Sequence, residues 1–163
     1  IIVLIATFLT GSLYLLYPQK NPKVYFRGYN VSAADIEAAK FIHSSTPSST
    51  RYIVLSSIIT AAAAIDQYSF STYYDTDQGK IFYYSIPSGG PLYQTYLSLL
   101  YHGQKKEKIE AALDLTKTTR AYVVIPDYWD NAPAIIAGMQ TIADSEKIIQ
   151  DGKMWVFTFD KKL

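Results

Sequence analysis

The first 17 residues form an almost uninterrupted apolar run. They read IIVLIATFLTGSLYLLY, and the first Lys or Arg in the chain is Lys20. A helix needs about 17–25 such residues to cross the hydrocarbon core of a membrane. The run therefore predicts a transmembrane helix over residues 1–17, with a linker over 18–31 that begins at Pro18. The alternative is an apolar helix buried in the folded body, although helices in soluble cores usually keep a polar stripe.

Beyond the linker, helical and strand patterns alternate. Ser32 and Asp35 form a capping-box pattern before apolar residues at helical spacing, which predicts a helix over 33–44. Two uncharged, β-branched runs predict buried strands within RYIVLSS at 51–57 and AYVVIP at 121–126. Further helices are predicted at 58–67, 91–103, 104–118 and 134–143.

Two turn signals predict antiparallel hairpins. DTDQGK at 75–80 separates two aromatic runs, and Asp151-Gly152 separates two alternating ones. Strands that alternate with helices indicate a sheet with helices on both faces. The predicted fold class is α/β: a three-layer αβα sandwich over 32–163, with a mostly parallel sheet and a C-terminal antiparallel hairpin.

The charge and the Cys content of the chain exclude several classes of partner and site. Fifteen Lys and Arg against 14 Asp and Glu give a net charge of +1, so nucleic acid is not an expected partner. The absence of Cys excludes disulfides, a thiolate zinc site and a cysteine nucleophile. Because the chain begins with Ile1 instead of Met, we expect a fragment or a processed form.

The order of these segments resembles a known family. An apolar span, ADIEAAKFIHSSTP, RYIVLSS, TRAYVVIPD and EKIIQDGKMWVFTFD follow one another along the chain. This order resembles the C-terminal extracytoplasmic domain of multi-span membrane glycosyltransferases of the GT-C type, the relatives of protein mannosyltransferase and oligosaccharyltransferase. The resemblance implies an extracytoplasmic location and a parent enzyme that uses lipid-linked sugars. The implied partners are membrane lipid, a glycan or lipid-linked sugar, and the rest of the parent protein.

That family's catalytic Asp residues lie in loops between earlier membrane helices, so the resemblance assigns no catalytic residue to this chain. Three functions are left open. The first is an accessory, noncatalytic domain that helps to position the lipid-linked donor or the acceptor. The second is a single-span surface protein or filament subunit that assembles through its N-terminal apolar helix. The third, an independent enzyme, would need a catalytic set that the sequence does not display.

The 15 Tyr residues are the other unusual feature of the sequence. A Tyr ring offers an apolar face and a hydroxyl, which suits stacking on a sugar, while core packing is its more common use. We predict that Tyr73, Tyr74, Tyr128 and Trp129 line one polar-aromatic surface for a glycan or for loops of the parent enzyme. Replacing Trp129 with Ala should then weaken binding and leave the melting temperature nearly intact.

Few residues suggest metal or acid–base chemistry. Asp75 and Asp77 have the spacing at which two carboxylates share a divalent cation, but a solvated hairpin turn is the simpler interpretation, and no other cofactor is expected. His43 and His102 lie near the ends of predicted helices, where the helix dipole favours them. Ser56 and Ser57 follow a predicted strand without the surrounding G-x-S-x-G pattern of a nucleophile.

Overall fold

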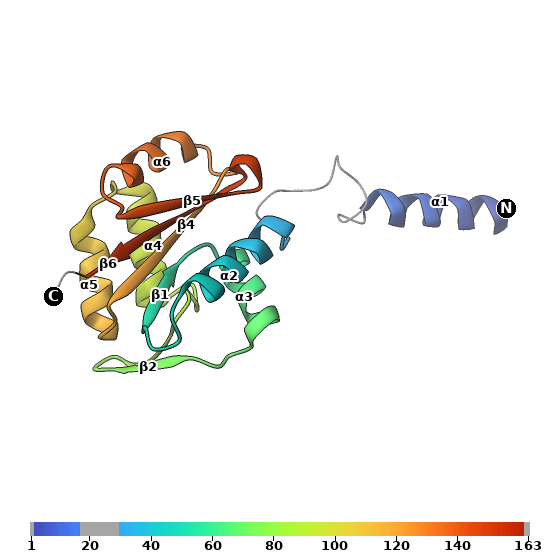
Figure 1. Cartoon of the computed structure of the whole chain (residues 1–163). Helices are drawn as coiled ribbons and strands as arrows, with labels where there is room; N and C mark the ends of the chain where they lie inside the picture. The colour runs from blue at the N-terminus through green and yellow to red at the C-terminus, as the bar shows by residue number, and fades with distance from the viewer. Residues whose placement is uncertain (1, 17–29, 162–163) are drawn as a thin grey trace. The chain divides into compact units, whose positions relative to one another are not determined.

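The computed structural model describes residues 2–16 and 30–161, and contacts divide the chain into two compact units, 1–30 and 31–163. The first unit contains the helix α1 (Ile2–Leu16), and the second contains the remaining elements (Figure 1). Its helices are α2 (Ala33–Ser45), α3 (Ile58–Tyr68), α4 (Pro91–Tyr101), α5 (Lys106–Thr116), α6 (Ala132–Gln140) and the 3₁₀ turn η1 (Gln150–Gly152). Its strands are β1 (Tyr52–Leu55), β2 (Tyr73–Thr76), β3 (Gly79–Phe82), β4 (Arg120–Pro126), β5 (Ser145–Ile149) and β6 (Met154–Asp160).

The predicted transmembrane helix over 1–17 is not found. In its place the structure has α1, with 15 residues, and no helix in the described part of the chain is both long and apolar enough to cross a membrane. At 1.5 Å per residue, a helix of this length reaches about 22 Å, short of the roughly 30 Å of a bilayer's hydrocarbon core. Residues 1 and 17, and residues 18–29 of the predicted linker, lie outside the described residues.

The main sheet has the strand order β1-β4-β6-β5. Among the neighbouring pairs of its described strands, only β1 with β4 is parallel, whereas β6 is antiparallel to both of its neighbours, β4 and β5. The prediction of a mostly parallel sheet is therefore wrong. The reason is the C-terminal hairpin: it places β6 beside β4, with Arg120 opposite Asp160 and Pro126 opposite Met154. The predicted hairpins themselves are confirmed, β5 with β6 and β2 with β3, and the second forms a separate two-stranded sheet.

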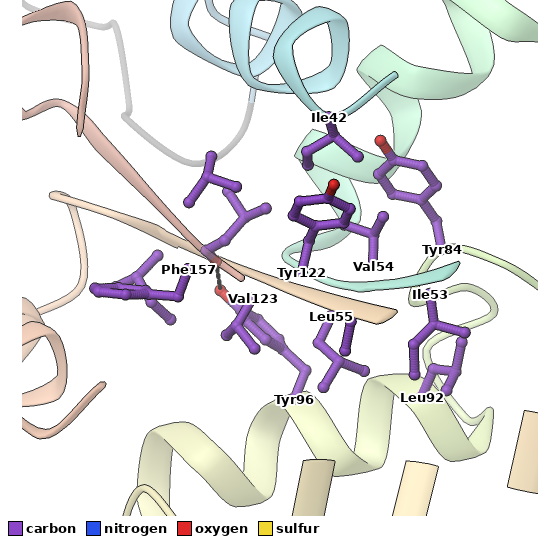
Figure 2. Close-up of a cluster of buried hydrophobic side chains, with 14 of the residues drawn as sticks. Ile42, Ile53, Val54, Leu55, Tyr84, Leu92, Tyr96, Tyr122, Val123 and Phe157 are labelled. Carbon is purple, nitrogen blue, oxygen red and sulfur yellow. Dashed lines mark hydrogen bonds between the residues drawn. The ribbon is translucent and has the colours of Figure 1, made fainter. Parts of the chain in front are cut away.

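Helices cover both faces of the main sheet, which confirms the mixed α/β class. Figure 2 shows α2 and α3 over one face, where Ile42 lies near Tyr122 and Val54, and α4 over the other, where Leu92 and Tyr96 pack. Successive residues of a strand point to opposite faces, so the buried strands β1 and β4 supply both layers of the core.

The outer edge of β1 is covered by the segment that follows β3. The Val54 amide donates to the Tyr83 carbonyl at 2.8 Å, and the Ser85 hydroxyl donates to the Val54 carbonyl at 3.0 Å. The Ser56 amide in turn donates to the Ser85 hydroxyl, at 3.0 Å. This covering satisfies backbone groups that would otherwise be unpaired at a sheet edge, and it brings Tyr83 against the first residue of β1.

Candidate functional site

The carboxyl ends of β1 and β4 are where a ligand is usually bound in an open α/β sheet. Here that end is filled by four polar residues that we call the carboxyl-edge cluster: Asp35, Ser56, Ser57 and Thr60. Asp35 completes the capping box of α2, since its carboxylate accepts from the Ser32 amide at 2.9 Å and from the Ser32 hydroxyl at 2.6 Å. The same carboxylate accepts from the Thr60 hydroxyl of α3 at 2.7 Å.

The carboxyl-edge cluster is closed to solvent. Its four residues are at most 5% exposed, and Ser57 caps α3 by accepting from the Thr60 amide at 3.2 Å. The start of α2 and the start of α3 are thereby joined through one buried carboxylate. Because these oxygens are already hydrogen-bonded and inaccessible, the cluster stabilises the fold and offers no site to a ligand.

Tyr128 and Trp129 lie beside this closed end, in the loop between β4 and α6. Both are half-buried, their rings lie 5.6 Å apart, and Trp129 also makes an edge-on contact with Tyr101 at 6.5 Å. Burial raises the pKa of Tyr128 to about 12, although a hydrogen bond with Ser57 opposes part of the rise. Trp129 packs against the hydrophobic core, and its indole N–H is buried without a hydrogen bond to another described residue.

The amino ends of the same two strands are different. A cavity of about 280 Å³ opens there, which we call the tyrosine pocket. It lies where the last turns of α2 and α3, the loop before β1 and the segment after β3 meet. Four aromatic side chains line it, His43, Tyr52, Tyr68 and Tyr83, together with Pro47 and five hydroxyl residues, Thr46, Ser48, Thr50, Ser71 and Thr72.

The aromatic walls of the tyrosine pocket are fixed by ring contacts. His43 and Tyr68 stack with their centroids 4.0 Å apart and their planes 18° apart. Tyr52 meets Tyr83 edge-on at 5.5 Å and Tyr122 edge-on at 5.7 Å. Burial, with the neighbouring phenols, raises the pKa of Tyr52 and of Tyr83 above the ordinary value of 10.0. The two phenols are therefore neutral at physiological pH.

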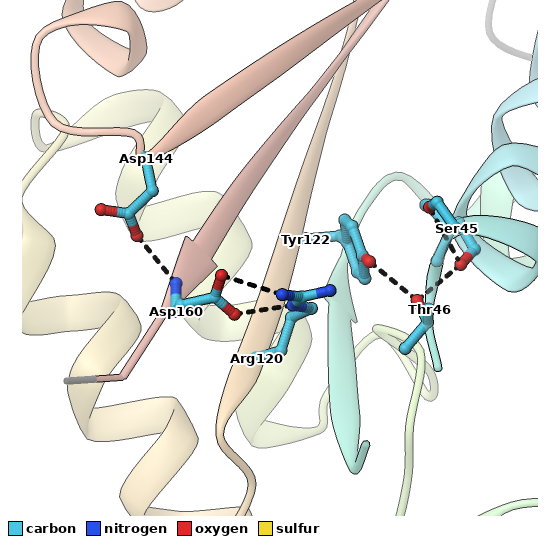
Figure 3. Close-up of polar contacts among 7 residues, drawn as sticks. Ser45, Thr46, Arg120, Tyr122, Asp144 and Asp160 are labelled. Atoms are coloured by element: carbon cyan, nitrogen blue, oxygen red, sulfur yellow. Dashed lines mark hydrogen bonds and ion pairs between the residues drawn. The ribbon is translucent and has the colours of Figure 1, made fainter. Parts of the chain in front are cut away.

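Polar contacts hold the pocket's rim against the main sheet. Thr46 donates to the Ile42 carbonyl at 2.6 Å, so the Tyr122 hydroxyl is the donor in the 2.7 Å contact between Tyr122 and Thr46. Figure 3 shows this contact near the ion pair of Arg120 with Asp160. Arg120 is the first residue of β4, and Asp160 is the last residue of β6. Arg120 donates to both carboxylate oxygens of Asp160, at 2.6 and 2.9 Å, and this pairing raises the pKa of Arg120.

The four aromatic residues predicted to share one surface lie at two distant places. Tyr74 is buried, and its hydroxyl accepts from the Tyr52 amide at 3.1 Å and donates to the Tyr52 carbonyl at 2.8 Å. It thus ties β2 to the amino end of β1, while Tyr128 lies beyond the carboxyl end of β4. Seven residues of β4 separate these ends, which at 3.3 Å per residue is about 20 Å.

Tyr73 points away from Tyr74, as neighbouring strand residues do. It is exposed and lines a second cavity, of about 420 Å³, between the β2–β3 hairpin and the start of α4. We call this cavity the hairpin groove. Its lining is mostly apolar and includes Phe70, Phe82 and Leu92, and Lys80 also lines it. The Tyr73 and Phe82 rings lie 5.2 Å apart there.

Asp75 and Asp77 lie at the tip of the β2–β3 hairpin, both exposed. Asp75 is opposite Lys80 in the strand register, and the Thr76 hydroxyl closes the turn by donating to the Gly79 carbonyl at 2.7 Å. Within the described residues no group of three or more His, Cys, Asp or Glu side chains could hold a metal ion. The geometry is that of a hairpin turn.

Sequence reasoning did not find the tyrosine pocket. Its four aromatic side chains, at positions 43, 52, 68 and 83, come from separate elements and share no local spacing. The available signal was the abundance of Tyr in the middle of the chain. In comparisons with known proteins, no family model, no curated protein and no solved structure matches the chain.

Proposed function

We propose that this chain is an accessory, noncatalytic domain held by α1 at the extracytoplasmic surface of a membrane. There it accompanies a glycosyltransferase of the GT-C type and helps to position that enzyme's lipid-linked sugar donor or its acceptor. The resemblance in segment order supports the enzyme class and the side of the membrane. The proposed contact with lipid is supported separately, by the exposed apolar side chains of α1.

The observation that carries the proposal is the exposure of α1. The six large apolar residues of α1 whose exposure the structure describes are 54–78% exposed and lie on all sides of the helix: Val3, Leu4, Ile5, Phe8, Leu9 and Leu13. A surface helix of a globular protein keeps a polar face toward water, whereas α1 contains no charged residue. Lipid is a solvent in which apolar side chains on every side are favourable.

The two Thr hydroxyls that the structure describes in α1 are also suited to hydrocarbon. Thr7 donates to the Val3 carbonyl at 2.9 Å, and Thr10 donates to the Ala6 carbonyl at 2.8 Å. Each hydroxyl therefore has a partner within the helix and needs no water, as polar groups in a bilayer must. Burying a Val, Leu, Ile or Phe side chain contributes about 1.5–3 kcal/mol, so the side chains of α1 together can hold the domain at a bilayer.

Flotation with phospholipid vesicles tests the membrane part of the proposal on the full chain. The wild type is expected to float with the vesicles, and the double variant Leu4→Lys/Phe8→Lys to stay at the bottom of the gradient. Each Lys removes apolar contact and adds about 2.5–3.5 kcal/mol when placed in hydrocarbon. The matched control is Ile148→Lys, which replaces an apolar residue 49% exposed on β5 and should float like the wild type.

Equal flotation of the double variant would contradict the proposal, as would a wild type that stays at the bottom. If the wild type instead forms assemblies without lipid and the double variant is monomeric, self-association through α1, the filament alternative, is supported. The accessory role makes a further expectation: the chain alone should neither transfer nor hydrolyse a polyprenyl-phosphate-linked sugar. Measured turnover would show that it is an enzyme in its own right.

A further inference from the structure

The tyrosine pocket contains hydroxyl groups that have no hydrogen-bond partner among the described residues. Among the residues that the structure describes, the side-chain oxygens of Ser48, Thr50 and Tyr68 take part in no hydrogen bond, and those of Ser71 and Thr72 meet only each other, at 3.5 Å. A hydroxyl both donates and accepts. These hydroxyls therefore suit a ligand whose own polar groups both donate and accept hydrogen bonds.

The electrostatics of the tyrosine pocket disfavour an anion. None of the described residues that line it is Lys, Arg, Asp or Glu, whereas phosphate and carboxylate ligands are usually held by Arg or Lys. His43 is in the last turn of α2, and Tyr68 is the last residue of α3. The cavity thus lies at the negative ends of two helix dipoles, which repel an anion and attract the hydroxyl protons of a neutral ligand.

Size and shape restrict the ligand further. The volume of the cavity, about 280 Å³, is just below the range of about 300–1,000 Å³ of the pockets that hold drug-sized ligands, so it suits one small ring. The stacked pair of His43 and Tyr68 forms one aromatic wall, and Tyr52 and Tyr83 form another. Such faces pack against the C–H groups of a ring whose hydroxyls point outward to polar partners.

We propose that the tyrosine pocket binds a single neutral pyranose ring, as a free sugar or as the terminal residue of a glycan. Ser48, Thr50 and Tyr68 supply hydrogen bonds to its hydroxyls, and the aromatic walls pack against its C–H groups. The inference deepens the proposed function and rests on it for the source of the sugar. All the described residues that line the pocket belong to the unit over 31–163.

Nuclear magnetic resonance titration of the ¹⁵N-labelled full chain tests this proposal. The probes are methyl α-mannopyranoside, methyl α-glucopyranoside and methyl β-galactopyranoside, and the chain is kept in a detergent without a sugar headgroup, which would compete. At least one probe is expected to shift the amide signals of residues 46, 48–50 and 71–72 with a dissociation constant in the millimolar range. No shift with any probe at about 100 mM, far above such a constant, would overturn the proposal, as would shifts confined to the hairpin groove.

Two conservative variants show whether the hydroxyls bind the sugar. Tyr68→Phe and Thr50→Val each remove one hydroxyl with little change of shape, and each should weaken binding about three- to tenfold, the value of one hydrogen bond. Tyr101→Phe is the matched control, because Tyr101 is 65% exposed at the end of α4, on the opposite face of the sheet. If the pocket variants bind the sugar as tightly as Tyr101→Phe does, the proposal is wrong.

The membrane variant separates this inference from the proposed function. Leu4→Lys/Phe8→Lys should bind the sugar as the wild type does, since α1 contributes nothing to the pocket. Sugar binding by a wild type that fails to float would leave the pocket assignment in place and refute the membrane role. Flotation without sugar binding would refute the pocket assignment alone.

Discussion

At the carboxyl end of the parallel strands β1 and β4, four polar side chains are buried and hydrogen-bonded, whereas at their amino end polar side chains face a cavity of about 280 Å³. The carboxyl-edge cluster contains a carboxylate and three hydroxyls in full contact with protein. The described lining of the tyrosine pocket contains hydroxyls and phenols and no Lys, Arg, Asp or Glu, and several of these hydroxyls have no hydrogen-bond partner within the described part of the chain. Equally polar residues thus have a structural role at one end and are free to bind at the other.

The difference follows from the direction of the helices. The amino ends of α2 and α3 meet at the carboxyl end of the sheet, and a helix start has free N–H groups that need an acceptor. Asp35 and Ser57 supply acceptors there and are buried as a result. At the other end the helices finish, the connecting loop contains Pro47 and Ser48, and short side chains leave space between large rings. In this fold a ligand site is therefore to be sought at the end that needs no helix N-caps.

The largest effect is expected from breaking the closed end. Asp35→Ala removes the carboxylate that accepts from Ser32 and from the fully buried Thr60 hydroxyl, while the Ser32 hydroxyl still caps α2 through the amide of residue 35. Losing the hydrogen bonds from Ser32 costs about 1 kcal/mol, and leaving the buried Thr60 hydroxyl without its acceptor costs about 1–3 kcal/mol, so the free energy of unfolding should fall by about 3 kcal/mol in urea denaturation.

The matched control is Glu37→Ala, an exposed residue two positions further along the same helix, for which a change within about 0.5 kcal/mol is expected. In contrast, Tyr68→Phe at the pocket should cost little stability, because the Tyr68 hydroxyl makes no hydrogen bond to any residue that the structure describes. If Asp35→Ala is as stable as Glu37→Ala, or if Tyr68→Phe is the more damaging change, the distinction between a closed and an open end is wrong.

A somewhat smaller effect is expected at Trp129, where the structure revises the expectation from sequence. Trp129 packs against the core and contacts both Tyr128 and Tyr101, so Trp129→Ala should lower the free energy of unfolding by about 2–3 kcal/mol, below the 3–5 kcal/mol of a fully buried Trp. Thermal and urea unfolding measure this loss. An unchanged melting temperature, together with weakened sugar binding, would restore the surface role that the sequence suggested.

Local signals predicted most of the elements and the pairing within both hairpins, but not how the C-terminal hairpin pairs with the rest of the sheet. The Ser32–Asp35 capping box, the β-branched runs and the Asp151-Gly152 turn depend on neighbouring residues, and each is present in the structure. The position of β6 between β4 and β5 depends on contacts across the sheet, which an alternating strand pattern does not specify. For the same reason, Tyr74 could be recognised as aromatic but not as the residue that binds the backbone of Tyr52.

The binding site was harder to predict than the fold because its residues are ordinary individually. His43 was expected at a helix end, and α2 does have it in its last turn. What the sequence did not reveal is that Tyr68, the last residue of α3, stacks on it, and that the segment after β3 brings Tyr83 beside them. The contact between these two helix ends depends on how α2 and α3 pack together on one face of the sheet.

The smallest expected effect is on the free energy of unfolding at alkaline pH. It tests whether water is excluded from the core around Tyr96. Tyr96 is fully buried, and its hydroxyl donates to the Val124 carbonyl at 3.1 Å. Burial raises its pKa well above 10.0, so above pH 10 the unfolded chain loses a proton that the folded protein keeps. The stability from this proton is complete below pH 10 and is lost as the pH rises toward the folded pKa, by about 1.4 kcal/mol per pH unit.

Tyr96→Phe should therefore make the decline of stability between pH 10 and 11 shallower by up to that amount, while costing about 1 kcal/mol at pH 7 for the lost hydrogen bond. Urea denaturation at several pH values measures both. Phe159→Leu is the control: Phe159 is 1% exposed and does not titrate, so this variant should be less stable at every pH and keep the wild-type slope. If Tyr96→Phe also keeps that slope, Tyr96 titrates in the folded protein much as it does in the unfolded chain, and water reaches this part of the core.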